Sequence, residues 1–175
     1  MSTRRQLAFG LALVLVVAAC AIEPKNTYPP AGSTPQAVGD ATNATKQAVI
    51  GALAAAGLQA FDSVRPYRPA EGPLLAAAPR SIVQVALPDD PDHGFIAIYA
   101  FDSANAALAA ANDQATWVTG PTGRMNFPLG RRFVIRVLGS NVIWFWWLPG
   151  SSPDPHFDQI DPALESIGEE VIVPG

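Results

Sequence analysis

Two pairs of apolar, β-branched segments, each pair separated by turn residues, constrain the fold of this chain more than any other feature. The segments and their turns are residues 81–87 and 95–101 around Pro88-Asp89-Asp90-Pro91-Asp92-His93-Gly94, and residues 131–138 and 142–148 around Gly139-Ser140-Asn141. Pro, Asp, Asn and Gly favour tight turns, so each pair predicts a β-hairpin. With 17 Pro and 14 Gly in 175 residues, a long coiled coil or a helical repeat is excluded.

Helix signals lie beside and between the hairpins. Residues 44–57 have the three-and-four apolar spacing of an amphipathic helix. Asp102-Ser103 can cap an alanine-rich helix that follows the first hairpin. Asp161-Pro162 can begin a short helix that ends at Gly168. We therefore expect three helices.

These elements define the predicted fold class. Residues 58–64 are expected to form a short edge strand, and residues 65–80 an irregular loop. The sequence thus predicts an α+β domain with a four- or five-stranded, mostly antiparallel sheet built from two hairpins, and with helices packed on one face. We expect residues 44–175 to form this single globular domain.

The first twenty residues have the pattern of an export signal. Arg4 and Arg5 precede the apolar run of residues 7–17, which is too short to span a bilayer. Val17-Ala18-Ala19-Cys20 resembles the lipobox of bacterial lipoproteins. That resemblance implies cleavage before Cys20, a diacylglyceryl thioether on its sulfur and a further acyl chain such as palmitate on its amino group.

The resemblance also implies a location. Residues 1–19 would be a lipoprotein signal peptide, and residues 20–43, rich in Pro, Gly, Ser and Thr, a flexible tether from the lipidated Cys20. The protein would be extracytoplasmic and anchored to the cell membrane, or to the outer membrane in an envelope that has two. Arg4 and Arg5 leave the general secretory and twin-arginine routes open. Residues 45–172 resemble small bacterial lipoproteins of uncharacterised activity.

Charge excludes one class of partner. The formal net charge is -4, with 11 basic and 15 acidic residues. Removal of Arg4 and Arg5 leaves 9 basic residues against 15 acidic ones, a net charge of -6. A domain this acidic is not expected to bind nucleic acid.

An aromatic run in the second hairpin, Trp144-Phe145-Trp146-Trp147, is the main candidate binding feature. Because side chains alternate along a strand, Trp144 and Trp146 are expected on one face, and Phe145 and Trp147 on the other beneath the helices. The same alternation predicts that Gln84, Tyr99 and Arg136 lie beside a tryptophan pair. It also groups the following apolar side chains on the opposite face: Val83, Val85, Ile96, Ile98, Phe133 and Ile135.

Two exposed tryptophans would form a patch of ~400 Å², large enough to imply a cover. Three alternatives remain. The loop of residues 65–80 could fold over the patch through Leu74 and Leu75. The patch could instead be a site of self-association or of a protein partner, or it could stack on a small apolar or sugar-like ligand.

No catalytic or metal site is predicted. The carboxylate and histidine groups at Asp154, His156, Asp158 and Asp161, and at Asp89, Asp90, Asp92 and His93, are typical of helix starts and turns. A nucleophile beside its base is not found, and Cys20 is the only cysteine. Arg131, Arg132 and Arg136 could contact lipid headgroups, but strand-edge charges explain them as well. We therefore expect a binding or assembly module without a cofactor, with an envelope enzyme that has no recognisable motif as the alternative.

Overall fold

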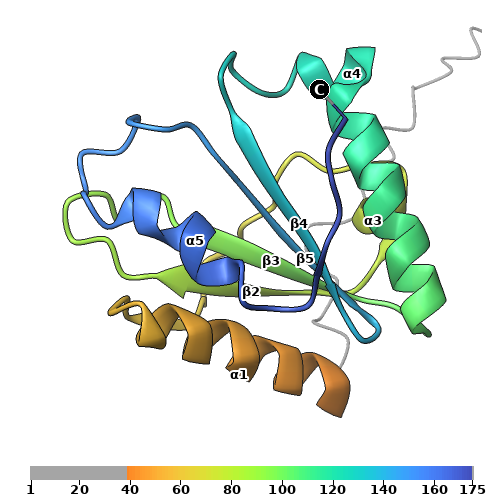
Figure 1. The fold of residues 1–175 in the computed structure, drawn as a ribbon, viewed down its shortest axis with the longest axis horizontal. Helices are drawn as coiled ribbons and strands as arrows, with labels where there is room; N and C mark the ends of the chain where they lie inside the picture. Colours follow the sequence, from red (N-terminus) through yellow and green to blue (C-terminus); the bar gives the residue numbers. More distant parts are fainter. Residues whose placement is uncertain (1–38, 175) are drawn as a thin grey trace, which may run out of the picture. The chain divides into compact units, whose positions relative to one another are not determined.

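The computed structural model describes residues 39–174. Its helices are α1 (Asp40–Ala55), α2 (Pro73–Ala77), α3 (Ala104–Thr119), α4 (Pro121–Arg124), the 3₁₀ helix η1 (Phe157–Gln159) and α5 (Ile160–Leu164). Its strands are β1 (Ala60–Asp62), β2 (Arg80–Val85), β3 (Phe95–Ala100), β4 (Arg132–Leu138), β5 (Asn141–Trp147) and β6 (Glu169–Glu170). Figure 1 shows the two central hairpins meeting at one end and diverging toward the other.

The strands form one sheet in the order β1-β2-β3-β5-β4-β6, and every neighbouring pair is antiparallel. The predicted α+β class, both hairpins and the edge strand within residues 58–64 are confirmed. The expected strand number of four or five is too low. Strand β6 was missed because it has two residues, Glu169 and Glu170, which are too few to produce a periodic pattern.

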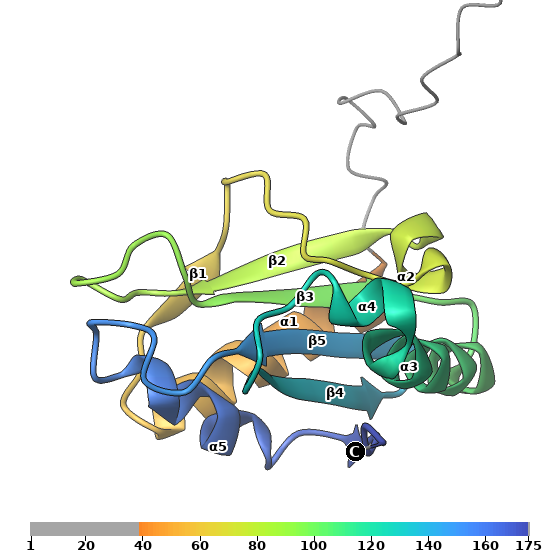
Figure 2. The same ribbon diagram turned by 90° about the horizontal axis from the view of Figure 1, so that it is seen from above.

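Helices pack on both faces of the sheet, not on one as expected. On one face α1 and α5 cover a core that contains Val83, Val85, Ile96, Ile98, Val134, Ile143, Phe145 and Trp147. On the other face α2 and α3 cover a core that contains Ala97, Tyr99, Ile135, Val137, Val142 and Trp144. In Figure 2, α2, α3 and α4 gather toward one end of the strands and α5 lies toward the other. The central strands are apolar on both sides, so both faces require a cover.

The prediction of which β4 side chains face which side of the sheet was wrong by one residue. Val134 pairs with Phe145, and its side chain joins the core beneath α1 and α5. Ile135 and the half-buried Phe133 pack in the core beneath α3. A shift of one residue moves every side chain of a strand to the opposite face of the sheet. The faces of β4 relative to those of β2 and β3 depend on how β4 pairs with β5, and the sequence does not fix this pairing.

Helix α1 begins four residues earlier than expected. Its first residue is Asp40, and the hydroxyl of the buried Thr42 donates a hydrogen bond to Asn141 Oδ1 at 2.8 Å. Asn141 in turn donates through Nδ2 to Thr45 Oγ1 at 3.1 Å. Residues 40–43 were expected in the tether because of their polar composition. They belong to the folded domain, because the Thr42 hydroxyl and the Ala41 carbonyl bind the buried amide of Asn141.

Helix α3 has the predicted cap. Ser103 is its N-cap, and the Ser103 side chain accepts a hydrogen bond from the Ala106 N–H. The alanines on the inner side of the helix bring it close to β4 and β5; they are Ala107, Ala110, Ala111 and Ala115. Within residues 39–174 no helix combines the length and the apolar character needed to cross a membrane.

Candidate ligand-binding site

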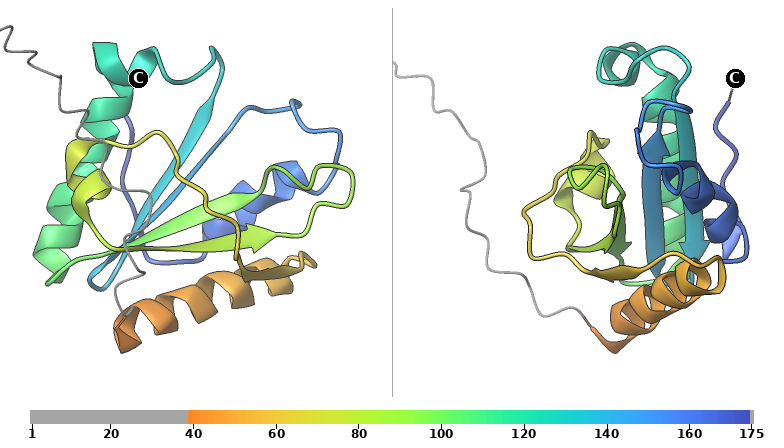
Figure 3. Two further views of the ribbon diagram at one scale, coloured as in Figure 1. Left: turned by 180° about the vertical axis from the view of Figure 1, so that it is seen from behind. Right: turned by 90° about the vertical axis from the view of Figure 1, so that its left-hand side faces the viewer.

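The sheet splits between its two central strands. The ladder of β3 and β5 ends where Ala97 lies opposite Trp144. Two residues further along, Phe95 and Trp146 would form the next pair of the same kind, but the ladder does not include them. Beyond Ala97 the two hairpins separate, as the right-hand view of Figure 3 shows. We call this region the fork.

Gly94 shapes the beginning of β3 at the fork. Its φ is 78°, a left-handed conformation that glycine adopts most readily, and an added Cβ would lie 3.0 Å from Leu87 Cδ1. The carbonyl of Gly94 accepts a hydrogen bond from the Val85 N–H of β2. Because main-chain groups alternate along a strand, the N–H and C=O of Phe95 then face β5 and the fork.

A pocket of about 290 Å³ occupies the fork. Aromatic side chains from four separate segments line it: Tyr67, Phe95, Phe145, Trp146, Trp147 and Phe157. Asp92, His93 and Ser151 contribute polar groups to the same lining. The combination of apolar walls with a few polar groups is typical of small-molecule sites, and the volume lies near the lower end of their ~300 to 1,000 Å³ range.

Tyr67 closes the fork on the side of β3. Its ring stacks on Phe95, with centroids 4.6 Å apart and an interplanar angle of 15°. Burial raises the pKa of the Tyr67 phenol above its ordinary value of 10.0, although a hydrogen bond from the Trp146 indole acts in the opposite direction. Tyr67 is therefore a neutral hydroxyl at physiological pH and connects both strands of the fork.

His93 is held in a defined orientation at the pocket. Its Nδ1 lies 2.6 Å from Asp90 Oδ1, and its ring meets Phe157 edge-on with centroids 6.0 Å apart. Burial alone would raise the pKa of Asp90, but hydrogen bonds from Ser152 and His93 lower it below 3.8. Asp90 is thus an ionised acceptor at neutral pH, so the proton must be on Nδ1. Nε2 of His93 is left to accept, or when protonated to donate, a hydrogen bond.

The two acidic groups that flank the fork are joined in space. Asp154 Oδ2 accepts from the Asp89 N–H at 3.2 Å, and the Ser152 hydroxyl donates to Asp90. Hydrogen bonds from the backbone of His156 and then of Asp89 lower the pKa of Asp154, while burial opposes them. These contacts join the two turns to each other. Among residues 39–174 no group of three His, Cys, Asp or Glu side chains is arranged to hold a metal ion.

Of the candidate face proposed from the sequence, only Trp146 lines the pocket. Trp144 is 1% exposed and Tyr99 0% exposed. Phe127 contacts the rings of Trp144 and Trp146 at 6.3 and 5.2 Å between centroids, so the loop after α4 covers this pair together with α3.

Residues 65–80 lie on the same face, in agreement with one of the three alternatives. Leu75 is buried in the core with Tyr99, whereas Leu74 is half exposed. The Tyr99 hydroxyl donates to the buried carboxylate of Glu71, which also pairs with Arg68 Nε at 2.8 Å. This segment was expected to be an irregular loop, but it contains helix α2.

Gln84 and Arg136 have positioning roles away from the pocket. Gln84 is buried, and its Nε2 donates to the Pro91 carbonyl at 3.0 Å, which fixes the β2–β3 turn. Arg136 does not lie beside Trp144 as predicted. It is on the other face, where its guanidinium donates to the carbonyls of Ile167, Glu165 and Gly168 and holds the end of α5.

The sequence reasoning missed Tyr67, Phe95 and Phe157 as site residues. Tyr67 lies in a segment between two prolines, where no periodicity places a side chain. Phe95 and Phe157 could have been suspected only through their neighbours, because each stands beside a histidine-containing turn. A pocket assembled from four segments leaves no local motif.

The predicted signal peptide, the lipobox and Cys20 lie outside the residues that the structure describes. Comparison of the chain with known protein families, with curated proteins and with solved structures found no match.

Proposed function

We propose that this chain is an extracytoplasmic binding module, anchored to a membrane by a lipid on Cys20, and that it binds a small sugar-like ring in the fork pocket. The anchor is inferred from Val17-Ala18-Ala19-Cys20. The binding role rests on one observation above all, the aromatic pocket that opens where β3 and β5 separate. A membrane-held binding module needs such a pocket and no catalytic group.

The ligand class follows from the two kinds of surface in the pocket. A pyranose ring has an apolar face of C–H bonds, which stacks on aromatic rings such as Trp146 and Tyr67. Its hydroxyls need donors and acceptors, which His93 and Ser151 provide at the wall. The volume of about 290 Å³ suits one ring better than a long chain.

The oriented imidazole adds selectivity. Because Asp90 fixes the proton on Nδ1 of His93, Nε2 presents one defined hydrogen-bonding position to a hydroxyl. Asp92 is 2.8 Å from Arg65 and largely exposed, so it adds no uncompensated charge to the pocket. A neutral polar ligand therefore fits this site better than a strongly charged one.

Titration of the protein with neutral monosaccharides, followed by tryptophan fluorescence and by NMR shifts of the indole N–H groups, tests the binding role. We expect saturable changes at Trp146, with Trp146→Leu weakening the affinity by about 2- to 10-fold because one stacking contact is lost. Leu108→Ala, a change at an exposed residue of α3, is the matched control. Saturation that is unaffected by Trp146→Leu would place the ligand elsewhere.

Mass spectrometry of the membrane fraction tests the anchor separately. We expect a mature chain that begins at an acylated Cys20, and expect Cys20→Ser to abolish both acylation and cleavage because oxygen cannot replace the thioether sulfur. An unmodified Cys20 still joined to Ala19 would overturn the anchor and leave the pocket hypothesis intact.

A further inference from the structure

The arginines of this domain divide into paired and unpaired groups. Residues 39–174 contain eight lysine and arginine side chains, and five form ion pairs with carboxylates: Lys46, Arg65, Arg68, Arg80 and Arg136. Within the same residues the other three, Arg124, Arg131 and Arg132, form none. Exposed ion pairs contribute little to stability, so these three arginines can remain available to bind an external anion.

All three arginines line one groove. It has a volume of about 810 Å³ and lies along the outer edge of β4, between the loop after α4 and the C-terminal segment. Arg124 and Arg132 are exposed, and Arg131 is held with its guanidinium 5.6 Å from the centre of the Phe133 ring. The fixed ring keeps the Arg131 charge at the surface instead of folding it onto a carboxylate.

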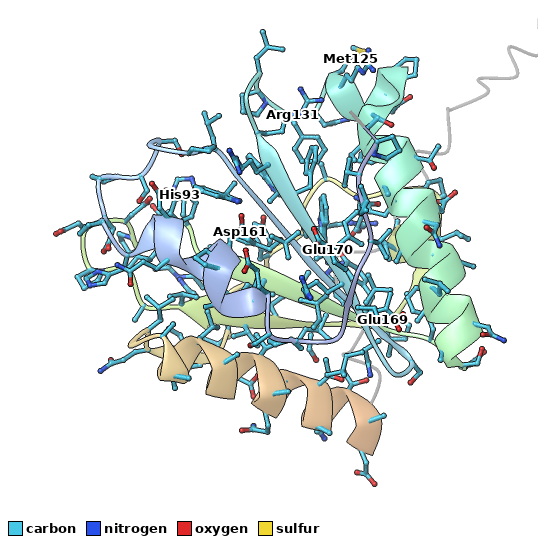
Figure 4. All side chains as sticks on the ribbon, viewed as in Figure 1. His93, Met125, Arg131, Asp161, Glu169 and Glu170 are labelled. Atoms are coloured by element: carbon cyan, nitrogen blue, oxygen red, sulfur yellow. The ribbon has the colours of Figure 1, made fainter. Side chains whose placement is uncertain are left out.

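Large apolar side chains protrude from the same end of the molecule. Leu129 is 91% exposed and Ile172 81%, and both line the groove; Met125, next to Arg124, is 88% exposed. Figure 4 places Met125 and Arg131 together at this end, whereas Asp161 and Glu170 lie toward the middle of the molecule. The groove therefore has a cationic and apolar outer end and an acidic inner end.

We propose that this end, formed by Arg124, Met125, Leu129, Arg131, Arg132 and Ile172, docks onto the surface of an anionic lipid bilayer. Singly protruding apolar side chains can enter the boundary between headgroups and acyl chains, and guanidinium groups beside them bind lipid phosphates. The contact would orient the domain and is independent of the fork pocket.

Arg136 is not part of this surface. Its guanidinium is committed to three carbonyl groups at the end of α5 and to Glu170 at 4.0 Å. The acidic groups of the groove, Asp161, Glu165 and Glu170, line the side toward α5 and β6. They would repel a bilayer that covered the whole groove, so the contact is confined to the outer end.

A local probe on the whole chain tests the proposal. In a Cys20→Ser background, Leu129→Cys provides a single cysteine for an environment-sensitive fluorophore. The labelled protein is mixed with vesicles of phosphatidylcholine alone or of phosphatidylcholine with phosphatidylglycerol. We expect a blue shift and protection from a water-soluble quencher only with the anionic vesicles, and loss of both at high salt.

Variants separate the contribution of the charges. Each arginine near an anionic surface contributes about a fivefold change in the binding constant. Replacing all three with Gln should therefore lower the binding constant for anionic vesicles by about a hundredfold. Replacing all three with Lys should restore much of it, and circular dichroism checks that both variants are folded. Val64→Cys carries the control label, since Val64 is 96% exposed and lies in a different segment.

Each contrary result overturns the proposal. An equal response to both vesicle types, or an unchanged response in the Gln variant, would exclude recognition of anionic lipid by these arginines. A shift of the same size at position 64 would show unspecific adsorption. No response at position 129 would exclude docking of this surface onto the bilayer.

Discussion

The ring of Tyr67 stacks on the ring of Phe95, with centroids 4.6 Å apart and an interplanar angle of 15°. Through this contact a loop residue is fixed to a strand at the point where the sheet divides. Arg65 adds a hydrogen bond to the Pro91 carbonyl at 3.0 Å and an ion pair with Asp92 at 2.8 Å. The wall of the pocket is thus attached to the β2–β3 turn by both stacking and charge.

Tyr67 and Tyr99 should resist alkaline titration. Burial is the largest cause that raises the pKa of both phenols above 10.0, and for Tyr99 the charge of Glu71 raises it further. Above pH ~10 the unfolded chain loses these protons more readily than the folded one, so stability that is present below that pH is lost as pH rises. Phenolate absorbance of the wild type, Tyr67→Phe and Tyr99→Phe is the measurement.

In that titration each Phe variant should lack one increase in phenolate absorbance, which in the wild type occurs at high pH together with unfolding. A phenol that ionised near its ordinary pKa while far-ultraviolet circular dichroism remained native would show that the side chain is open to water. Glu71→Gln should move the Tyr99 step toward lower pH, because it removes the neighbouring charge.

Trp144 and Trp146 should differ in their contributions to stability. Trp144 is 1% exposed, so Trp144→Thr is expected to lower the free energy of unfolding by about 3 to 5 kcal/mol. Trp146 is only partly buried at the pocket, and Trp146→Thr should cost about 1 to 2 kcal/mol because part of its surface already meets water. Urea midpoints of the two variants measure these losses in the free energy of unfolding, and Trp147→Thr is the buried comparison.

Sedimentation of the same variants addresses assembly. If Trp146→Thr dissociated an oligomer while Trp144→Thr did not, the exposed part of this face would serve self-association. Equal and large stability losses from both variants, with no change in mass, would instead show that Trp146 belongs to the core.

The four hairpin strands were predictable from the sequence because their signals are local. Turn residues 88–94 and 139–141 delimit the hairpins, and Ser103 marks the beginning of α3. In β2, β3 and β5 the faces were predicted correctly. The face of each β4 side chain was not predictable, because the phase of β4 is set by its pairing with β5, as Val134 opposite Phe145 shows. The presence of helices on both faces was not predicted, because the order of helices and strands along the chain is the same whether the helices cover one face of the sheet or both.

The candidate site was predictable only at Trp146. Its pocket exists because β3 and β5 separate beyond Ala97 and Trp144, and strand divergence has no signal in composition or periodicity. Arg136 was misplaced for the same reason as Phe133, a phase error of one residue. The unpaired state of Arg131 and Arg132 likewise depends on where the carboxylates of α5 and β6 lie in space.

Residues before Asn43 should stabilise the folded domain. Thr42 donates a buried hydrogen bond to Asn141, so a chain beginning at Asn43 would leave this amide with an unsatisfied acceptor. We expect it to be less stable than a chain beginning at Thr34 by about 1 to 3 kcal/mol. Urea denaturation of both chains is the measurement, and Thr42→Ala in the longer chain should reproduce most of the loss.

Acid should weaken the attachment of the β2–β3 turn to the turn after β5 through Asp90. Its pKa is below 3.8 in the folded protein because hydrogen bonds from Ser152 and His93 outweigh the effect of burial. Between 3.8 and that lower value the unfolded chain binds a proton that the folded chain does not. The stability that this carboxylate contributes is therefore present above about pH 4 and is lost as pH falls through the folded pKa.

Asp90→Asn removes the titrating group, so its free energy of unfolding should be lower at neutral pH and should fall less steeply below about pH 4. The comparison variant is Asp92→Asn in the same turn, because the Asp92 side chain is 82% exposed. Urea midpoints from neutral to acid pH measure both. If the wild type and Asp90→Asn lost stability in parallel with acid, the Ser152 and His93 contacts to this carboxylate would not hold the two turns together.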